Sequence, residues 1–192
     1  MVELGFRELS MEPVVAPAEF DYALTDEDVF AACREYEKLG KHYVEQYKKG
    51  EPYNFFHFNV DLTGGPCLPK RLSGCGAGHD YLAISPEGDL YPCHQFVGEE
   101  AYKVGTVDTG IVNFDLCRDF QKANVLSKEA CMKCWARFYC SGGCHANNLR
   151  YGGSLTTPYS KGCTLQKKRL ETAIGVQVQK ALYDMEQAEK AE

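Results

Sequence analysis

The stretch that most constrains this chain runs from residue 131 to residue 144 and holds four cysteines in the spacing Cys-x2-Cys-x5-Cys-x3-Cys. Thiolates are preferred ligands of iron–sulfur clusters and of zinc, and a Cys-x2-Cys turn presents two sulfurs on one side of a tight loop. Gly142 and Gly143 lie inside the last step, where the missing Cβ permits positive φ and lets the backbone approach an inorganic core closely. The pattern predicts a metal-binding loop around which the neighbouring chain folds.

The composition fits one globular domain or two small ones, with 192 residues, 44% hydrophobic and 25% charged. The formal net charge is −6 and no basic stretch occurs, which argues against a nucleic-acid-binding protein. Neither an apolar run of about 18 residues nor a basic-then-apolar leader is visible, so we expect a cytoplasmic protein with no membrane partner. In a reducing compartment, ten cysteines indicate metal ligands rather than disulfides.

The first 63 residues predict a strand, a helix and a second strand. A mixed run over residues 6–15 predicts a strand that ends near Pro13, because proline removes a donor from the ladder. Thr25-Asp-Glu-Asp28 predicts a capping box and a helix from about residue 26 to residue 49. The helix carries an apolar stripe, which makes Cys33 a core residue: Val29, Phe30, Cys33, Tyr36, Leu39, Tyr43 and Tyr47.

Residues 53–62 mix aromatic and β-branched side chains in a run that predicts the second strand. His57 lies in the middle of this run. We expect a half-buried, hydrogen-bonded histidine there rather than a catalytic one.

The remaining chain predicts a hairpin, a short helix and a long helix. Residues 81–93 form two short runs around a Pro-Glu-Gly-Asp turn, and antiparallel pairing would bring Cys75 and Cys93 to one end of the ribbon. A short helix over residues 113–126 would make Cys117 a core residue. From Leu165 onward, apolar residues at helical spacing predict a long closing helix.

Seven cysteines then form an ordered candidate ligand set, with Cys67 as an eighth candidate: Cys75, Cys93, Cys131, Cys134, Cys140, Cys144 and Cys163. Two four-thiolate sites need eight ligands, so seven cysteines would leave one position vacant. The spacing favours two iron–sulfur clusters. Structural zinc usually has two Cys-x2-Cys pairs where this chain has one, a disulfide scaffold suits a smaller secreted chain, and a bacterial ferredoxin needs Cys-x2-Cys-x2-Cys-x3-Cys-Pro.

The spacing Cys75-x12-Gly88-x4-Cys93, then Cys131-x2-Cys134-x5-Cys140-x3-Cys144 and finally Cys163, resembles the SPASM domain of radical S-adenosylmethionine (SAM) enzymes. The resemblance covers residues 64–170. Residues 65–78 and 84–98 look especially like the maturases of SCIFF (six cysteines in forty-five) peptides. That likeness implies thioether crosslinks between a cysteine sulfur and a carbon of another residue in a ribosomally made, cysteine-rich precursor peptide.

The resemblance implies two auxiliary [4Fe–4S] clusters. It assigns the first to Cys75, Cys93 and Cys144, and the second to Cys131, Cys134, Cys140 and Cys163. Cys67 would either complete the first cluster or leave that iron open to a substrate thiolate. Sulfatase-maturing relatives have a catalytic aspartate directly after the hairpin cysteine, whereas this chain has His94, which disfavours sulfatase maturation. His94 stays a candidate base, ranked below a structural role.

Radical SAM chemistry needs a Cys-x3-Cys-x2-Cys loop, and no such triplet occurs in this sequence. We therefore expect an α+β chain in which residues 1–63 are the last piece of a truncated βα barrel, residues 64–170 the SPASM domain and residues 171–192 a C-terminal helix. SAM and a third cluster would belong to a full-length enzyme with an N-terminal radical SAM domain, and this chain alone should not cleave SAM. The competing class is a peptide- or protein-binding module stabilised by zinc or iron–sulfur, without a redox role.

Overall fold

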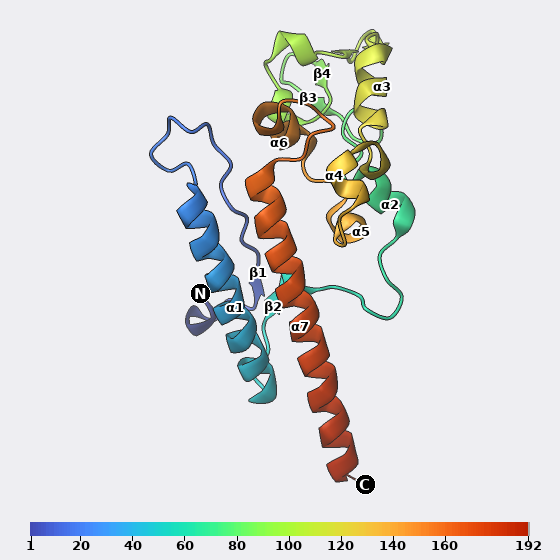
Figure 1. Cartoon of the computed structure of the whole chain (residues 1–192). Coiled ribbons are helices and arrows are strands. Elements are labelled where there is room, and N and C mark those ends of the chain that lie inside the picture. The colour runs from blue at the N-terminus through green and yellow to red at the C-terminus, as the bar shows by residue number, and fades with distance from the viewer. Residues whose placement is uncertain (192) are drawn as a thin grey trace. The chain divides into compact units, whose positions relative to one another are not determined.

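A computed structural model describes residues 1–191 of the chain, which forms two compact units. One unit combines Met1–Gly65 with the segment that begins at Thr164, and the other is Pro66–Cys163. The predicted α+β class is confirmed, because helices and small sheets occur together (Figure 1). It stays a prediction that residues 1–63 are the last piece of a βα barrel and that residues 64–170 are an iron–sulfur cluster domain. Within the described residues, no helix is long and apolar enough to cross a membrane.

The first unit is built on a β-α-β crossover. Strand β1 (Glu8–Leu9) pairs in parallel with β2 (Asn54–Phe55), and helix α1 (Asp26–Lys48) connects them. A parallel pair needs such a long crossover, because a tight turn can only reverse the chain. A single turn of 3-10 helix, η1 (Val2–Leu4), precedes β1.

Helix α1 begins with the predicted capping box. The backbone N–H of Asp28 donates to Thr25 Oγ1 over 3.1 Å, and the backbone N–H of Thr25 donates to the Asp28 carboxylate over 2.9 Å. The helix buries Val29, Tyr43 and Val44 as expected of an apolar stripe. The prediction was wrong for Phe30, which is 60% exposed, because it lies about 100° around the helix from Val29.

The predicted strand over residues 53–62 is wrong beyond its start. It ends at Phe55, and the chain turns into a 3-10 helix, η2 (Phe56–Phe58), which directs Phe58 into the core with no exposed surface. The core of this unit consists of Tyr43, Val44, Tyr53, Phe55, Phe58, Ala173 and Val176. Aromatic rings dominate it, and they pack edge to face, as between Tyr43 and Phe58.

The predicted long helix is confirmed as α7 (Ser160–Ala191), which begins before Leu165, so that Cys163 lies in its first turn. Helices α1 and α7 run side by side (Figure 1), and Lys168 pairs with Glu37 between them. Gly40 marks their closest approach, because a Cβ there would lie 2.5 Å from Cγ2 of Thr172. Further along α7, Val178, Leu182 and Met185 are exposed.

The second unit holds a four-stranded antiparallel sheet in the order β3-β4-β5-β6. The predicted hairpin is confirmed in β3 (Ala83–Ile84) and β4 (Asp89–Tyr91), with Gly88 at φ 89° in the turn. Strands β5 (Gly105–Thr106) and β6 (Gly110–Ile111) extend it. Two-residue strands are too short to show alternation in a sequence, which explains why they were not predicted.

Short helices make up the rest of this unit. They are α2 (Leu68–Ser73), α3 (Phe114–Lys122), α4 (Glu129–Met132), α5 (Arg137–Cys140) and α6 (His145–Asn147), with the 3-10 turns η3 (His94–Phe96), η4 (Glu100–Tyr102) and η5 (Val125–Ser127) and the π-helical turn η6 (Asn148–Gly152). Helix α3 is the predicted one, and Asn113 caps it by accepting from Leu116 N over 3.1 Å. Cys117 is buried against Leu90 and Val104, which confirms it as a core residue.

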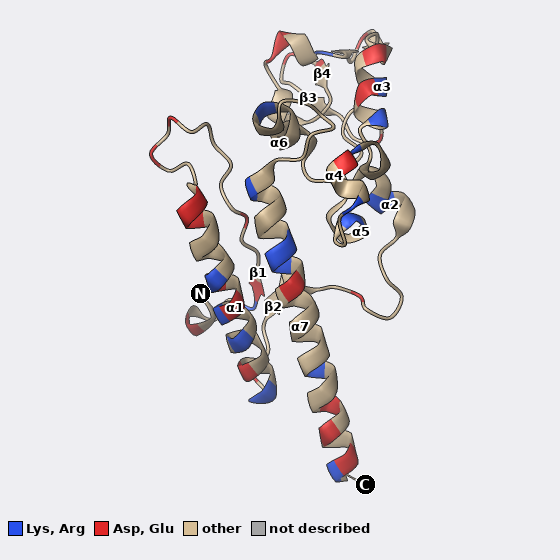
Figure 2. Ribbon diagram, in the orientation of Figure 1, with Lys and Arg blue, Asp and Glu red and all other residues tan. Residues whose placement is uncertain are grey.

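Acidic and basic side chains are interspersed along α1 and α7 (Figure 2). A nucleic-acid-binding face instead gathers lysine and arginine into a stripe or patch. These two helices carry no such one-signed face. The absence of a nucleic-acid partner stays a prediction for the whole chain.

His57 is held in the first unit by hydrogen bonding. Its side chain is 5% exposed, and Nε2 lies 3.1 Å from Ser10 Oγ and 3.3 Å from Glu12 Oε1. Burial lowers the pKa of the imidazole, and the charge of Arg169 lowers it further against the opposing effect of Glu12. The structure thus confirms the expected hydrogen-bonded histidine.

The close contact between Gly40 and Thr172 predicts that Gly40→Ala changes the free energy of unfolding in opposite directions with threonine and with serine at position 172. Gly40→Ala should lower the free energy of unfolding by about 1 kcal/mol, because overpacking against Thr172 outweighs the gain in helix propensity. In a Thr172→Ser background, which lacks Cγ2, the same change should raise it by about 0.5–1 kcal/mol. Gly175→Ala on α7 is the matched control, since a Cβ there meets nothing within 4 Å and should only stabilise. Urea denaturation of the four variants measures this, and equal effects of Gly40→Ala in both backgrounds would contradict it.

The buried His57 predicts a pH dependence of stability. The unfolded chain takes up a proton at His57 near the ordinary pKa of 6.5, whereas the folded chain does so only at lower pH. The unfolded state therefore binds more protons in that window, and the free energy of unfolding falls as the pH falls below about 6.5. His57→Gln should flatten this part of the profile. Denaturation between pH 7.5 and about 5 tests it, and parallel profiles for parent and variant would count against it.

Candidate metal centre

The second unit carries nine of the ten cysteines, counting Cys163 at its end. Three are exposed, namely Cys67, Cys75 and Cys144. The other six are buried or half-buried: Cys93, Cys131, Cys134, Cys140, Cys163 and the core residue Cys117. Cys33 is half-buried on α1, and burial raises the pKa of its thiol. None of the ten is in a disulfide in the part of the chain that the structure describes. The thiols of this unit are therefore available as ligands.

Cys75, Cys93 and Cys144 are electrostatic neighbours. Burial raises the pKa of the Cys93 thiol, and the nearby Cys144 and Cys75 raise it further. The backbone explains how the first two meet, because Gly78 N donates to Tyr81 O over 2.9 Å and to Pro92 O over 3.0 Å. These bonds fasten the loop after Cys75 to the end of the hairpin that precedes Cys93.

Lys128 lies among a second group of thiols. Its side chain is 0% exposed. Burial lowers the pKa of its ammonium, and the charges that act in the opposite direction come from Cys131, Cys140, Cys144 and Cys163. Cys134 belongs to the same loop through its N–H, which donates to Cys131 O over 3.0 Å. Cys144 thus neighbours both groups of thiols.

The loop between Cys140 and Cys144 has three consecutive residues with positive φ: Ser141 at 64°, Gly142 at 79° and Gly143 at 78°. The predicted conformational role of the two glycines is confirmed. Their surroundings add a second reason, because a Cβ on Gly142 would lie 3.0 Å from Lys128 Nζ and one on Gly143 would lie 3.1 Å from Asn148 Oδ1. Glycine is required here by side chains packed against the loop as well as by φ.

Four buried polar residues surround this loop, and sequence reasoning missed them: Lys128, Ser141, His145 and Asn148. Ser141 Oγ and His145 Nδ1 are buried without a hydrogen-bond partner among the residues that the structure describes. Burial and the charge of Lys128 lower the pKa of His145 to about 4. A single sequence gives no signal for Lys128, because a lysine beside Ser127 and Glu129 reads as an exposed residue at a helix start.

Helix α2 fixes the segment between Cys67 and Cys75. Arg71 Nη1 donates to Tyr139 O of α5 over 3.3 Å, and a Cβ on Gly74 would lie 3.4 Å from Cβ of Ser141. Arg71 therefore connects the first cysteine segment to the cysteine-rich loop.

His94 directly follows Cys93 and is exposed. Its Nδ1 lies 3.2 Å from Tyr81 Oη, and its Nε2 lies 3.4 Å from Gln95 Nε2. The contact with Tyr81 orients the ring across the hairpin. A role for His94 as a base stays a prediction.

The donor set fits an iron–sulfur cluster in its chemistry. Within residues 1–191, no three His, Cys, Asp or Glu side chains lie close enough together for a single metal ion. A tetrahedral zinc would need sulfurs about 3.8 Å apart, whereas several metal ions stand between the sulfurs of a cluster. The soft thiols, a buried cation beside them and two buried polar atoms without partners are the features that a buried, negatively charged cluster would use. The ligand assignment itself stays a prediction.

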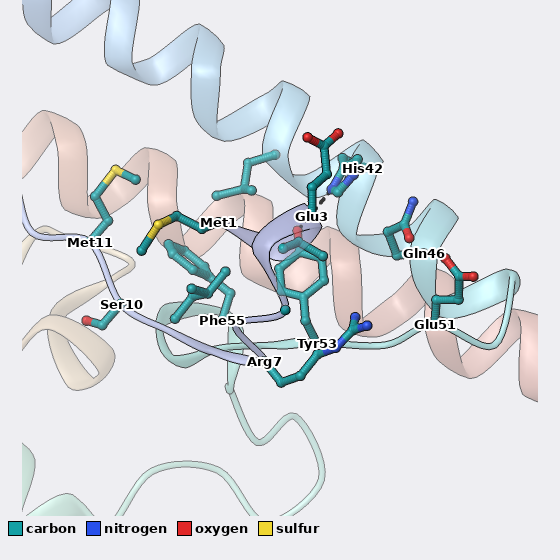
Figure 3. Close-up of a pocket in the computed structure, with 14 residues that line it drawn as sticks. Met1, Glu3, Arg7, Ser10, Met11, His42, Gln46, Glu51, Tyr53 and Phe55 are labelled. Atoms are coloured by element: carbon teal, nitrogen blue, oxygen red, sulfur yellow. Dashed lines mark hydrogen bonds between the residues drawn. The ribbon is translucent and has the colours of Figure 1, made fainter.

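The first unit contains a cavity of about 710 Å³ between η1, β1, α1 and β2 (Figure 3). Met1, Met11 and Phe55 line it together with His42, whose Nδ1 lies 3.1 Å from Tyr53 Oη. The imidazole at its wall is thus already engaged in a hydrogen bond. The residues that line this cavity include no cysteine, so the ligand set lies elsewhere.

Residues 75–135 match the family model of SPASM, an iron–sulfur cluster-binding domain. Mycofactocin maturase MftC from Mycolicibacterium smegmatis (strain ATCC 700084 / mc(2)155) is 32% identical over 111 residues, which are 55% of this chain and 27% of that protein. The matched family segment includes Cys75, Cys93, Cys131 and Cys134.

Solved structures of anSMEcpe share the fold. The structure with bound AdoMet and the Kp18Cys peptide is 18% identical with a TM-score of 0.61, over 95% of this chain and 51% of that one. The structure with bound AdoMet is 19% identical with a TM-score of 0.65, over 94% of this chain and 52% of that one. The chain therefore spans about half the length of these structures, and its matched part about a quarter of the maturase.

Replacing a cysteine by serine should have different effects on iron content in the candidate ligand set and in the apolar core. Cys140→Ser should remove about half of the iron that the parent binds after anaerobic reconstitution, because it deletes one ligand of one group. Cys117→Ser is the matched control, and it should keep the full iron content while losing about 1 kcal/mol of stability from the core. Iron analysis and thermal denaturation measure both. Equal iron loss in the two variants would refute the distinction between ligand and core cysteines.

Proposed function

We propose that Pro66–Cys163 holds two auxiliary [4Fe–4S] clusters of a radical SAM peptide maturase. The observation that carries this proposal is the grouping of the thiols. Cys75 and Cys144 both act electrostatically on Cys93, and Cys131, Cys140, Cys144 and Cys163 act on Lys128. The same division follows from the resemblance, with Cys134 as the remaining ligand of the second group. The match to an iron–sulfur cluster-binding domain supports it independently.

The residues present suit the binding of two clusters in different surroundings. Cys75 and Cys144 are exposed and Cys93 is buried, so the first group opens toward solvent on one side. Cys67 is also exposed, at the start of α2, and would either complete this group or leave one iron open to a substrate thiolate. The second group is half-buried or buried throughout and has four protein ligands. We infer that the first group faces the substrate and the second is closed.

When bound, such clusters supply a site for a thiolate and a reservoir for single electrons. The chain's own contribution is to orient the thiols and to exclude water from the second group. His94 would hold or move a proton beside the first group, oriented by Tyr81. The sequence has no Cys-x3-Cys-x2-Cys loop, so we propose that SAM cleavage needs a further domain and that this chain alone is inactive.

The substrate would be a cysteine-rich precursor peptide, and the product a thioether crosslink of the kind that SCIFF-like maturases form. The likeness of residues 65–78 and 84–98 supports this narrower assignment. The mycofactocin maturase and the peptide-bound anSMEcpe structure support a broader assignment, in which the substrate is a peptide that is modified.

A second candidate function is a metal-stabilised module that binds a peptide or protein without redox chemistry. The observation in its favour is that several large apolar side chains of the second unit are exposed, among them Ile84, Val97, Val112 and Trp135. Such a module would need metal for folding alone.

The metal content separates the two functions. Protein prepared without oxygen should contain about eight irons and eight sulfides per chain and show the broad visible absorption of [4Fe–4S] thiolate clusters. Cys67→Ser should leave this content unchanged if Cys67 is not a ligand and reduce it if it is. Near-stoichiometric zinc without sulfide, persisting after cluster reconstitution, would overturn the cluster proposal and favour the binding module.

A further inference from the structure

Lys128 is a lysine that is completely buried in the second unit. It lies directly before α4, and its side chain has no exposed surface. Fully buried lysines are rare unless a partner compensates the charge, because an isolated ammonium loses its hydration in the interior. Within residues 1–191, no ion pair joins Lys128 to a carboxylate, whereas the half-buried Lys103 and Lys168 both have one.

The polar contacts of Lys128 hold its position without neutralising it. Nζ donates to Gly142 O over 2.8 Å, and Asn148 Nδ2 donates to the same oxygen over 2.9 Å. Asn148 Oδ1 in turn accepts from Tyr159 N over 3.0 Å, just before α7. An ammonium has three donors, and one shared carbonyl satisfies a single one of them. The positive charge of the ammonium is therefore not neutralised by this hydrogen bond, and it acts on the other groups near Lys128.

Thiols surround it. Cys131 on α4, Cys140 on α5, Cys144 before α6 and Cys163 on α7 all act electrostatically on Lys128. Thiols are neutral in their protonated form and become negative when a metal takes them as ligands. Metal binding would therefore supply the missing negative charge from thiols on four separate elements.

We propose that the Lys128 ammonium is the internal counter-ion and positioning group of the second cluster, an inference that rests on the proposed function. A four-iron cluster with four thiolates is net negative and gains one more negative charge on reduction, with no proton transferred. A fixed buried cation stabilises the more negative state. Lys128 therefore raises the reduction potential of this cluster relative to one with a neutral residue in its place.

The test compares two lysines on either side of Cys131. Lys128→Met removes the buried charge at nearly constant length, and Lys133→Met removes an exposed charge inside the Cys-x2-Cys turn, where Lys133 pairs with Glu129 over 3.3 Å. Lys128→Gln removes the charge but keeps an N–H donor for Gly142 O. All are prepared without oxygen, analysed for iron and sulfide, and titrated with a chemical reductant while the reduced clusters are followed by electron paramagnetic resonance.

The expected result is that Lys133→Met behaves as the parent. Both Lys128 variants should make reduction of one of the two clusters less favourable by about tenfold, which is about 59 mV for one electron. Iron-loaded Lys128→Gln with unchanged potentials would overturn the proposal. Loss of iron from Lys128→Gln with the helical circular dichroism kept would support it, since the charge is then needed for cluster assembly, and loss of both would overturn it in favour of a packing role. A parent without iron and sulfide would instead refute the proposed function itself.

Discussion

The hydrogen bond from Lys128 Nζ to Gly142 O is the centre of a buried network in the second unit. The carbonyl of Gly142 also accepts from Asn148 Nδ2, and Asn148 Oδ1 accepts from Tyr159 N, so three hydrogen bonds connect four separate segments of the chain. Those segments carry or adjoin four cysteines. A shared, buried acceptor of this kind defines a loop conformation sharply, because any shift of the loop leaves several donors unsatisfied at once.

The two units are stabilised in different ways. The first has two long helices and a core of edge-to-face aromatic rings, which hydrophobic burial alone can support. The second has strands of two or three residues and mostly short helices around small apolar clusters. Elements this short are marginal on their own, so caps and turns have to contribute to folding, and the proposed metal centre would add to them.

Sequence reasoning predicted best where a local rule acts alone. The capping box at Thr25 and Asp28, the hairpin around Gly88 and the positive φ of Gly142 follow from residue types and spacing. It failed at residues 53–62, because the turn that buries Phe58 is decided by packing against α1 and α7. It also missed the lysine at position 128, because a side chain's burial depends on contacts that are distant in sequence. The spacing of the cysteines indicated the candidate ligands, whereas their polar surroundings required the fold.

The cysteines of the first group are more exposed than those of the second, which affects how metal would enter and leave each group. Cys75 and Cys144 lie at the surface while Cys93 is buried, and Cys131 is buried as well. An iron carrier and molecular oxygen would both reach the first group through its exposed thiols, so the group that is easiest to fill is also the easiest to damage. The second group would exchange metal only when the loop around Gly142 opens. Under the proposed assignment, air would therefore remove the iron of the first group before that of the second.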